Sequence, residues 1–294
     1  MLKALPTVLT EFNNDFEILR YRPYNRCTFR CSGFDSSVPV FGKLFADQRG
    51  ELIHHDSMSL WAAARARHLD FKVAKPIKWD SATGTVWQAA IHGQPLVDRL
   101  FSVSGAKLAG RIGMAAASLP ASRLKPTTRF DGTAQMQRSI KYAKELSLRM
   151  PELADSITRL IHTLHRIHAD SNNHKLRAIH GAPHAHQWLD CGDQLGLVDF
   201  DRYCLGDPEL DAATFIGEMD FEDREHVPVD KLNAIFLDAY QSIAGKLDFR
   251  LLQAYHSHKR LAKALKAARS IRLNGDRKAR RHLVYAFQAI KETV

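Results

Sequence analysis

The sequence lacks the residues and runs that several classes of protein require. Its 294 residues contain four cysteines, none in a CxxC pair and none near a histidine at zinc-finger spacing, so neither a disulfide framework nor a zinc knuckle is predicted. No stretch reaches the roughly 20 apolar residues of a transmembrane helix, and acids interrupt the amino terminus before a signal-type apolar run is complete. We therefore expect a soluble, cytoplasmic protein without a membrane partner.

Positive charge is unevenly distributed along the chain. The formal net charge is +10, and between residues 259 and 281 ten basic side chains accompany a single acid, Asp276. Leu261, Leu265 and Ala268 recur there at helical spacing, which predicts an amphipathic helix with a basic face. A solvated face is the structural interpretation, and an anion-binding face for nucleic acid or an acidic substrate is the functional alternative.

The first third of the chain differs in pattern from the remainder. Residues 16–45 alternate between apolar and polar and carry turn signals, which predicts a strand meander. Helical composition follows at residues 51–68, and beyond the turn at His92–Pro95 the chain is mostly helical. This order predicts an α+β fold of two lobes, a β-rich one over residues 1–92 and a helical one over residues 93–294.

The segment from Ala178 to Asp211 contains most of the chemistry-bearing residues. Gly196 to Asp201 is a short apolar strand that ends in an acid, so Asp199 would emerge at its end as a magnesium ligand. Gln187, twelve residues earlier, offers an amide oxygen to the same ion. Lys43 stands among apolar neighbours in a predicted strand, where an uncompensated charge is costly, and a phosphate contact would explain it. Transfer of a phosphoryl group from a nucleotide needs such a cation and such metal ligands.

Several of these residues form an ordered set of motifs: His180-Gly181, Gln187, Val198-Asp199-Phe200, and Gly206-Asp207-Pro208 with Asp211. Together they resemble the aminoglycoside phosphotransferase and choline kinase group, the small-molecule branch of the protein-kinase-like fold. That group usually has HGDxxxxN followed by IDFxxxxxGDPxxDLA. The resemblance implies ATP as the nucleotide, with GTP as the alternative, Mg²⁺ as the metal, and a small-molecule hydroxyl as the acceptor.

The resemblance also implies roles for individual residues. Asp199 would bind magnesium, and Gln187 would take the place of the usual metal-ligating asparagine. Lys43 would contact the nucleotide phosphates. Asp207 and Asp211 would be structural, since they would hold the loop and the helix that follows.

The remaining nucleotide contacts are implied in the amino-terminal lobe. Ala89 to Gly93 would form the hinge whose backbone binds the adenine, with Gln88 and Ala90 as the contacts there. Glu51 and Asp56 are the two candidates for the helical acid that pairs with Lys43, and the sequence does not separate them. No glycine-rich nucleotide loop is present between the first strands.

Ala182 departs from the pattern, because it follows His180-Gly181 where the group has its catalytic aspartate. A methyl group neither accepts a proton nor orients a hydroxyl, and loss of a positioned base removes about 10²- to 10⁴-fold of rate. The sequence therefore predicts a weak catalyst. Three explanations stay open: an engineered, inactivating Asp→Ala change, a natural pseudokinase that binds nucleotide without turnover, or a proton acceptor among His180, His184 and His186.

The sequence leaves alternatives open for the acceptor molecule and for the functional class of the protein. Acids between residues 218 and 225 favour a cationic amine as acceptor, whereas the basic carboxy-terminal segment favours an anionic one. A different class is a binding module, either a pseudokinase or a nucleic-acid partner that acts through its basic end. The sequence does not indicate an oligomeric state.

Overall fold

The chain divides into two compact units that do not follow its order. The computed structural model describes residues 16–31, 39–171, 175–219, 228–271 and 274–291. The first unit combines Met1–Asp98 with His186–Tyr203, and the second combines Arg99–Ala185 with Cys204–Val294. The first unit is thus not the single segment 1–92 that the sequence predicts, because residues 186–203 return to it. Within the part of the chain described, no helix is long and apolar enough to cross a membrane.

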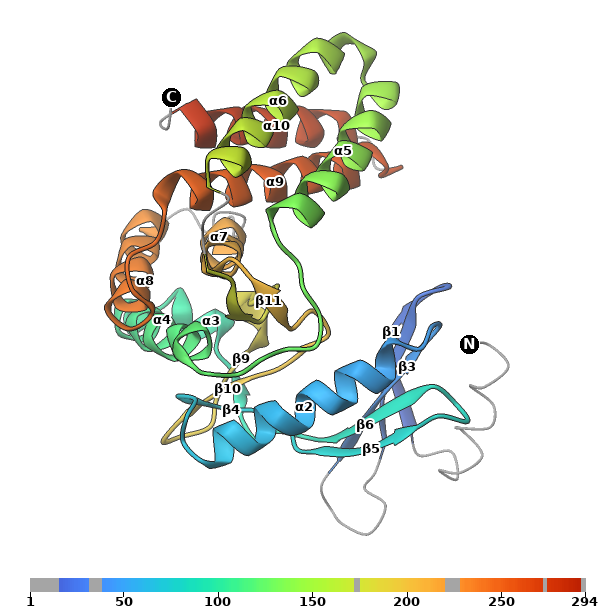
Figure 1. The fold of residues 1–294 in the computed structure, drawn as a ribbon, viewed down its shortest axis with the longest axis vertical. Helices are drawn as coiled ribbons and strands as arrows, with labels where there is room; N and C mark the ends of the chain where they lie inside the picture. The colour runs from blue at the N-terminus through green and yellow to red at the C-terminus, as the bar shows by residue number, and fades with distance from the viewer. Residues whose placement is uncertain (1–15, 32–38, 172–174, 220–227, 272–273, 292–294) are drawn as a thin grey trace. The chain divides into compact units, whose positions relative to one another are not determined.

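In its described residues the first unit contains two sheets and one long helix (Figure 1). Its elements are β1 (Phe16–Arg22), β2 (Arg26–Cys31), β3 (Val40–Phe45), α2 (Arg49–Arg65), β4 (Phe71–Lys72), β5 (Pro76–Asp80), β6 (Thr85–Ala89), β7 (Gln94–Pro95), β9 (Trp188–Asp190) and β10 (Leu195–Leu197). An antiparallel sheet has the order β1-β2-β3-β6-β5, of which β1 to β3 form the meander predicted over residues 16–45, and the second sheet has the order β4-β10-β9-β7.

One face of the five-stranded sheet carries an apolar cluster, and we call it the apolar face, although Phe45 and Val86 are buried on the other face. Phe29, Leu44 and Trp87 are buried on the apolar face, and the rings of Phe29 and Trp87 meet edge to face at 5.4 Å. Gly42 is required there, since a Cβ at this position would lie 2.3 Å from the Phe29 ring. Because successive strand residues alternate between faces, Lys43 points to the opposite side of the sheet, where α2 packs.

The second unit is predominantly helical. Its elements are α3 (Val97–Leu100), which begins two residues before the unit does, α4 (Gly105–Ala121), α5 (Gly132–Arg149), the 3₁₀ turn η1 (Pro151–Leu153), α6 (Ala154–Asp170), β8 (Arg177–Ile179), β11 (Cys204–Gly206), α7 (Pro208–Met219), α8 (Val229–Ala244), α9 (Phe249–Ala268) and α10 (Gly275–Lys291). β8 and β11 pair antiparallel. Helices α5, α6, α9 and α10 lie together and enclose one apolar core (Figure 1).

The basic carboxy-terminal segment forms two helices, so the prediction of one amphipathic helix was wrong. Leu261 and Leu265 are buried as expected, but α9 ends at Ala268 and α10 starts at Gly275. A Cβ at Gly275 would lie 2.8 Å from the Ala267 carbonyl oxygen, which explains the glycine at this close approach. Basic side chains here pair with acids of other elements: Lys263 with Glu218, Arg269 with Glu145, and Arg280 with Glu152. The local excess of charge is therefore partly neutralised by acids distant in sequence.

Two buried histidines join three helices of the second unit. His168 Nε2 of α6 lies 2.9 Å from His258 Nε2 of α9, and His258 Nδ1 lies 2.7 Å from Ser139 Oγ of α5. Two facing ring nitrogens share one proton, so at least one ring is neutral in this arrangement. Burial lowers the pKa of His168 to about 4, with His165 adding to this and Asp131 opposing it. Burial and His168 lower the pKa of His258 well below its ordinary value.

This pair predicts a loss of stability in acid. Both histidines have pKa values near 6.5 when unfolded, so below that pH the unfolded chain binds more protons than the folded one, and the free energy of unfolding falls as pH is lowered toward 4. We expect each histidine to account for a loss of about 2 kcal/mol between pH 7 and pH 5, and the pair for about 4 kcal/mol, measured by urea unfolding. His168→Gln should reduce this loss, whereas His162→Gln, at an exposed position of the same helix, should not. An equal effect of both variants would contradict the assignment.

Candidate functional site

Lys43 and Arg26 reach the same place from neighbouring strands. In the β2–β3 register Thr28 is opposite Lys43 and Arg26 is opposite Phe45. Residues opposite one another, and those two apart on a strand, share a face of the sheet, so Arg26 lies diagonally from Lys43 on the α2 side. Their side chains are only 11% and 8% exposed, respectively. Two cations so deeply buried require anionic partners.

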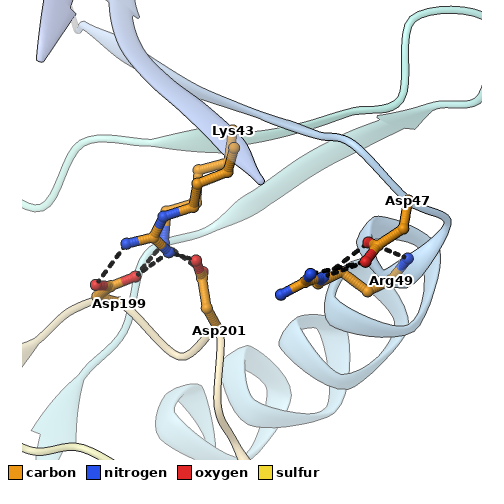
Figure 2. A network of polar contacts seen from close by, with 6 residues as sticks. Lys43, Asp47, Arg49, Asp199 and Asp201 are labelled. Atoms are coloured by element: carbon orange, nitrogen blue, oxygen red, sulfur yellow. Dashed lines mark hydrogen bonds and ion pairs between the residues drawn. The ribbon is translucent and has the colours of Figure 1, made fainter. Parts of the chain in front are cut away.

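Those partners are Asp199 and Asp201, which follow β10. Lys43 Nζ donates to Asp199 Oδ1 at 2.7 Å and to Asp201 Oδ1 at 2.6 Å (Figure 2). Arg26 Nη1 and Nη2 lie 3.3 and 3.5 Å from Asp199 Oδ1 and Oδ2, and Arg26 also pairs with Asp201. We call Arg26, Lys43, Asp199 and Asp201 the ionic quartet. A separate pair, Asp47–Arg49, lies at the start of α2.

The quartet carries no net formal charge, which makes its burial tolerable. Burial lowers the pKa of Lys43, and Asp199 opposes that effect both through its charge and through its hydrogen bond. The sequence analysis found Lys43 and Asp199 but missed Arg26 and Asp201. The signals for these two were present: a second acid two residues after Asp199, and a basic residue in the preceding strand.

Asp199 has a backbone conformation that is unusual for its residue type. Its φ is +71°, in the left-handed region, where a residue other than glycine costs about 1–3 kcal/mol. The surrounding ring contacts help to hold this turn, since Phe200 stacks on Phe71 at 6.1 Å and meets Tyr203 edge to face at 6.0 Å. Strain of this kind is typical of functional sites.

Gln187 lies beside the start of this turn. The Val198 N–H donates to the Gln187 carbonyl oxygen at 3.2 Å, next to the pairing of Leu197 with Trp188 in the β9–β10 register. The segment thus brings one amide and two carboxylate side chains, the hard oxygen donors that magnesium prefers, to one end of a strand pair. Among the described residues no three acids, histidines or cysteines form a complete metal cage. The donor set therefore fits Mg²⁺ held by one or two side chains together with phosphates and water.

Gln88 and Ala90 line different pockets. Gln88 lines a small pocket with Lys43, Asp199 and Asp201, whereas Ala90 lines a wider one together with Trp61 of α2. In the expected hinge two backbone donors are already used, because the Ala89 N–H donates to Lys75 O at 2.9 Å and the Ala90 N–H donates to Pro39 O at 3.0 Å. A nucleotide base would therefore be bound through other backbone groups of this segment.

The two helical acids differ in burial, and the structure gives Lys43 other partners. Glu51 is exposed in the first turn of α2, and Asp56 is buried with His55 Nδ1 at 3.5 Å. The ion pairs of Lys43 in the described residues are those with Asp199 and Asp201.

The loop that contains Ala182 is held by Asp211 of α7 in the second unit. The backbone N–H groups of His180 and Gly181 donate to Asp211 Oδ2 and Oδ1 at 2.7 and 2.8 Å. Burial raises the pKa of Asp211 to about 7, and the two hydrogen bonds and Lys259 oppose that effect. Gly181 has φ +78°, a conformation that favours glycine. Asp211 therefore fixes the backbone immediately before Ala182.

The three histidines near Ala182 differ in burial and in their contacts. His180 is 1% exposed, and its Nδ1 accepts the Ala182 N–H at 3.3 Å. His184 Nδ1 lies 3.6 Å from a carboxylate oxygen of Glu218. His186 is exposed and belongs to the first unit. The structure therefore gives the buried His180 ring a hydrogen bond within the loop.

Asp207 connects the start of α7 to α9. The Tyr255 hydroxyl donates to Asp207 Oδ2 at 2.5 Å, and both side chains are buried. Burial, followed by the charge of Asp207, raises the pKa of Tyr255 well above its ordinary value. Tyr255 is a further residue that the sequence analysis did not identify.

Comparison with known proteins places these motifs in one family. The family model described as "Phosphotransferase enzyme family" matches residues 60–260. No significant match was found among curated proteins. Solved structures similar in fold include the ethanolamine kinase of Plasmodium vivax, with 13% identity, a TM-score of 0.65, and coverage of 95% of this chain and 84% of that chain. A choline/ethanolamine kinase family protein of Mesorhizobium loti has 15% identity, a TM-score of 0.63, and coverage of 97% and 90%. The GDP complex of aminoglycoside 2'-phosphotransferase-IIIa has 12% identity, a TM-score of 0.64, and coverage of 100% and 99%.

Proposed function

The chain belongs to the phosphotransferase enzyme family and has the kinase-like α+β fold expected from its sequence, and from this we propose that it is an ATP- or GTP-dependent kinase for a small-molecule hydroxyl. The observation that carries the proposal is the buried contact of Lys43 with Asp199 and Asp201, beside Gln187. A cation and oxygen ligands at one place are what nucleotide phosphates and magnesium require.

Each residue has a role in this proposal. Asp199 and Gln187 would hold Mg²⁺, with Asp201 adjacent, and the ion when bound supplies positive charge that offsets the charge of the phosphates. Lys43 would then contact phosphate oxygens. Asp211 would keep the backbone of the Ala182 loop in place.

Ala182 limits what the chain does with a bound nucleotide. Its side chain provides no proton acceptor, and it is buried in a loop that Asp211 already orders. We therefore propose impaired transfer, with nucleotide binding by a pseudokinase as the second candidate. The loss of the base, rather than a disordered loop, is the reason.

The acceptor is proposed only as a hydroxylated small molecule. The structures named above are of kinases for ethanolamine, choline and aminoglycosides, which carry amines. Of the acids at 218–225, only Glu218 lies within the described residues. Burial raises the pKa of Glu218, but Lys259 and Lys263 outweigh it and lower that pKa to about 2. Glu218 is thus already paired with two cations, which argues against it as the binding residue for an amine.

Replacement of Asp199 tests the proposal. We expect Asp199→Asn to weaken binding of Mg-ATP or Mg-GTP by about 100-fold or more. Replacing a residue that only supports a metal ligand already costs about 10- to 100-fold in metal affinity, and the loss of a ligand should cost at least as much. Calorimetry measures this, with thermal unfolding to establish that the variant is folded. Asp47→Asn is the matched control, because Asp47 is an exposed aspartate of the same unit that pairs with Arg49. Unchanged binding by Asp199→Asn would overturn the role of Asp199, and no nucleotide binding by the wild-type chain would overturn the function.

A further inference from the structure

Arg26 is buried in the ionic quartet, but the proposed function gives it no role. It contacts both carboxyl groups through its terminal nitrogens. Its Nε is buried and has no hydrogen-bond partner within the described part of the chain. A buried donor without a partner costs free energy, and an acceptor arriving with a ligand would satisfy it.

The neighbourhood of Arg26 is basic as well. Arg26 is paired with Arg22 across the β1–β2 hairpin. Burial lowers the pKa of Arg22, as do the charges of Arg20, Arg26 and Arg202, while Asp199 opposes them. The turn between these strands is Pro23-Tyr24-Asn25, without glycine. Arginine side chains are therefore positioned at a hairpin that lacks a glycine-rich backbone cradle, and guanidinium groups suit phosphate oxygens.

Charge balance indicates that Arg26 and a metal ion would not bind the same carboxylate at once. In the quartet the two cations already occupy oxygens of Asp199, which Mg²⁺ would need as ligands. Arg26 and Mg²⁺ thus compete for one carboxylate. When the ion takes that carboxylate, the guanidinium loses an anionic partner, and a phosphate oxygen is the replacement of the right charge.

We propose that Arg26 has two alternating partners, the metal-binding carboxylates when the site holds no nucleotide and the nucleotide phosphates when it does. The inference rests on the proposed role of Asp199 in magnesium binding. In the first state Arg26 is a positioning residue that keeps Asp199 and Asp201 in place and opposes binding of a metal ion without nucleotide. In the second it contributes to the binding of nucleotide, as the glycine-rich loop does elsewhere.

The test compares Arg26→Gln with Arg30→Gln, an exposed arginine of the same strand that pairs with Glu17 at 2.7 Å. Binding of Mn²⁺ alone is followed by electron paramagnetic resonance, and binding of Mg-ATP by calorimetry. We expect Arg26→Gln to bind Mn²⁺ alone more tightly, by about threefold or more, since a competing charge is removed. We expect it to bind Mg-ATP about tenfold more weakly, the size of one lost charge-assisted contact. Arg30→Gln should change neither.

Further outcomes separate this proposal from the proposed function. Arg26→Lys keeps the charge and should recover part of the Mg-ATP affinity, which a purely structural loss in Arg26→Gln would not explain. If the wild-type chain binds Mg-ATP, Asp199→Asn loses it, and Arg26→Gln matches wild type with both probes, the function stands and the role of Arg26 is wrong. If the wild-type chain binds neither Mg-ATP nor Mg-GTP, both proposals are overturned.

Discussion

Replacing Ala182 by aspartate is expected to raise the rate of phosphoryl transfer by about 10²- to 10⁴-fold, the contribution of a positioned general base. The backbone next to position 182 is already ordered, because Asp211 accepts hydrogen bonds from His180 and Gly181 and because Gly181 adopts the left-handed conformation of the turn. Consumption of Mg-ATP or Mg-GTP would be followed against a panel of hydroxylated metabolites and aminoglycosides. A gain with one acceptor would also identify the substrate class.

Ala182→Asn is the control for this gain. It has the shape of aspartate and accepts no proton, so it should leave the rate near that of the wild-type chain. Equal gains in both variants would mean that the residue acts by positioning and not as a base. Nucleotide binding by all three chains without turnover of any acceptor would favour the pseudokinase instead.

Removal of the Asp211 carboxylate is expected to lower the free energy of unfolding by about 2–6 kcal/mol. Asp211→Ala leaves the buried N–H group of His180 and the partly buried N–H group of Gly181 without their acceptor, and an orphaned buried group costs about 1–3 kcal/mol. Urea or thermal unfolding of the full chain measures the change. Asp238→Ala, at an exposed position of α8, should change stability by less than about 0.5 kcal/mol.

A loss for Asp211→Ala no greater than that for Asp238→Ala would contradict the role of Asp211 in holding the loop. A folded Asp211→Ala that still binds Mg-ATP through the first unit, but does not respond to an added Ala182→Asp, would show that the carboxylate positions the loop.

The strands were predictable because their pattern is local. Alternation and turn residues located β1 to β3, and the cost of a buried charge singled out Lys43 within β3. The return of residues 186–203 to the first unit was not predictable in the same way. It depends on β4, β7, β9 and β10, strands of two or three residues that are too short for any periodicity.

Charge compensation explains the other differences. The basic end gave a clear composition signal, but its partners Glu145, Glu152 and Glu218 are scattered over distant helices. Likewise, the partners of Lys43 follow a strand far along the chain, and not the helix next to it. A single sequence shows which side chains are charged, whereas the pairing of those charges is a property of the folded chain.

The divided first unit has a consequence for how the protein is made. Residues 71–72 pair in parallel with residues 195–196, so β4 has no partner strand until about two thirds of these 294 residues have been synthesised. The same holds for Lys43 and Arg26, whose counter-charges Asp199 and Asp201 are synthesised last among the four. Until then the nascent strands carry two unneutralised cations on the face that α2 covers. A fragment that stops near residue 98 lacks both carboxylates as well as strands β9 and β10, so it does not contain the whole first unit.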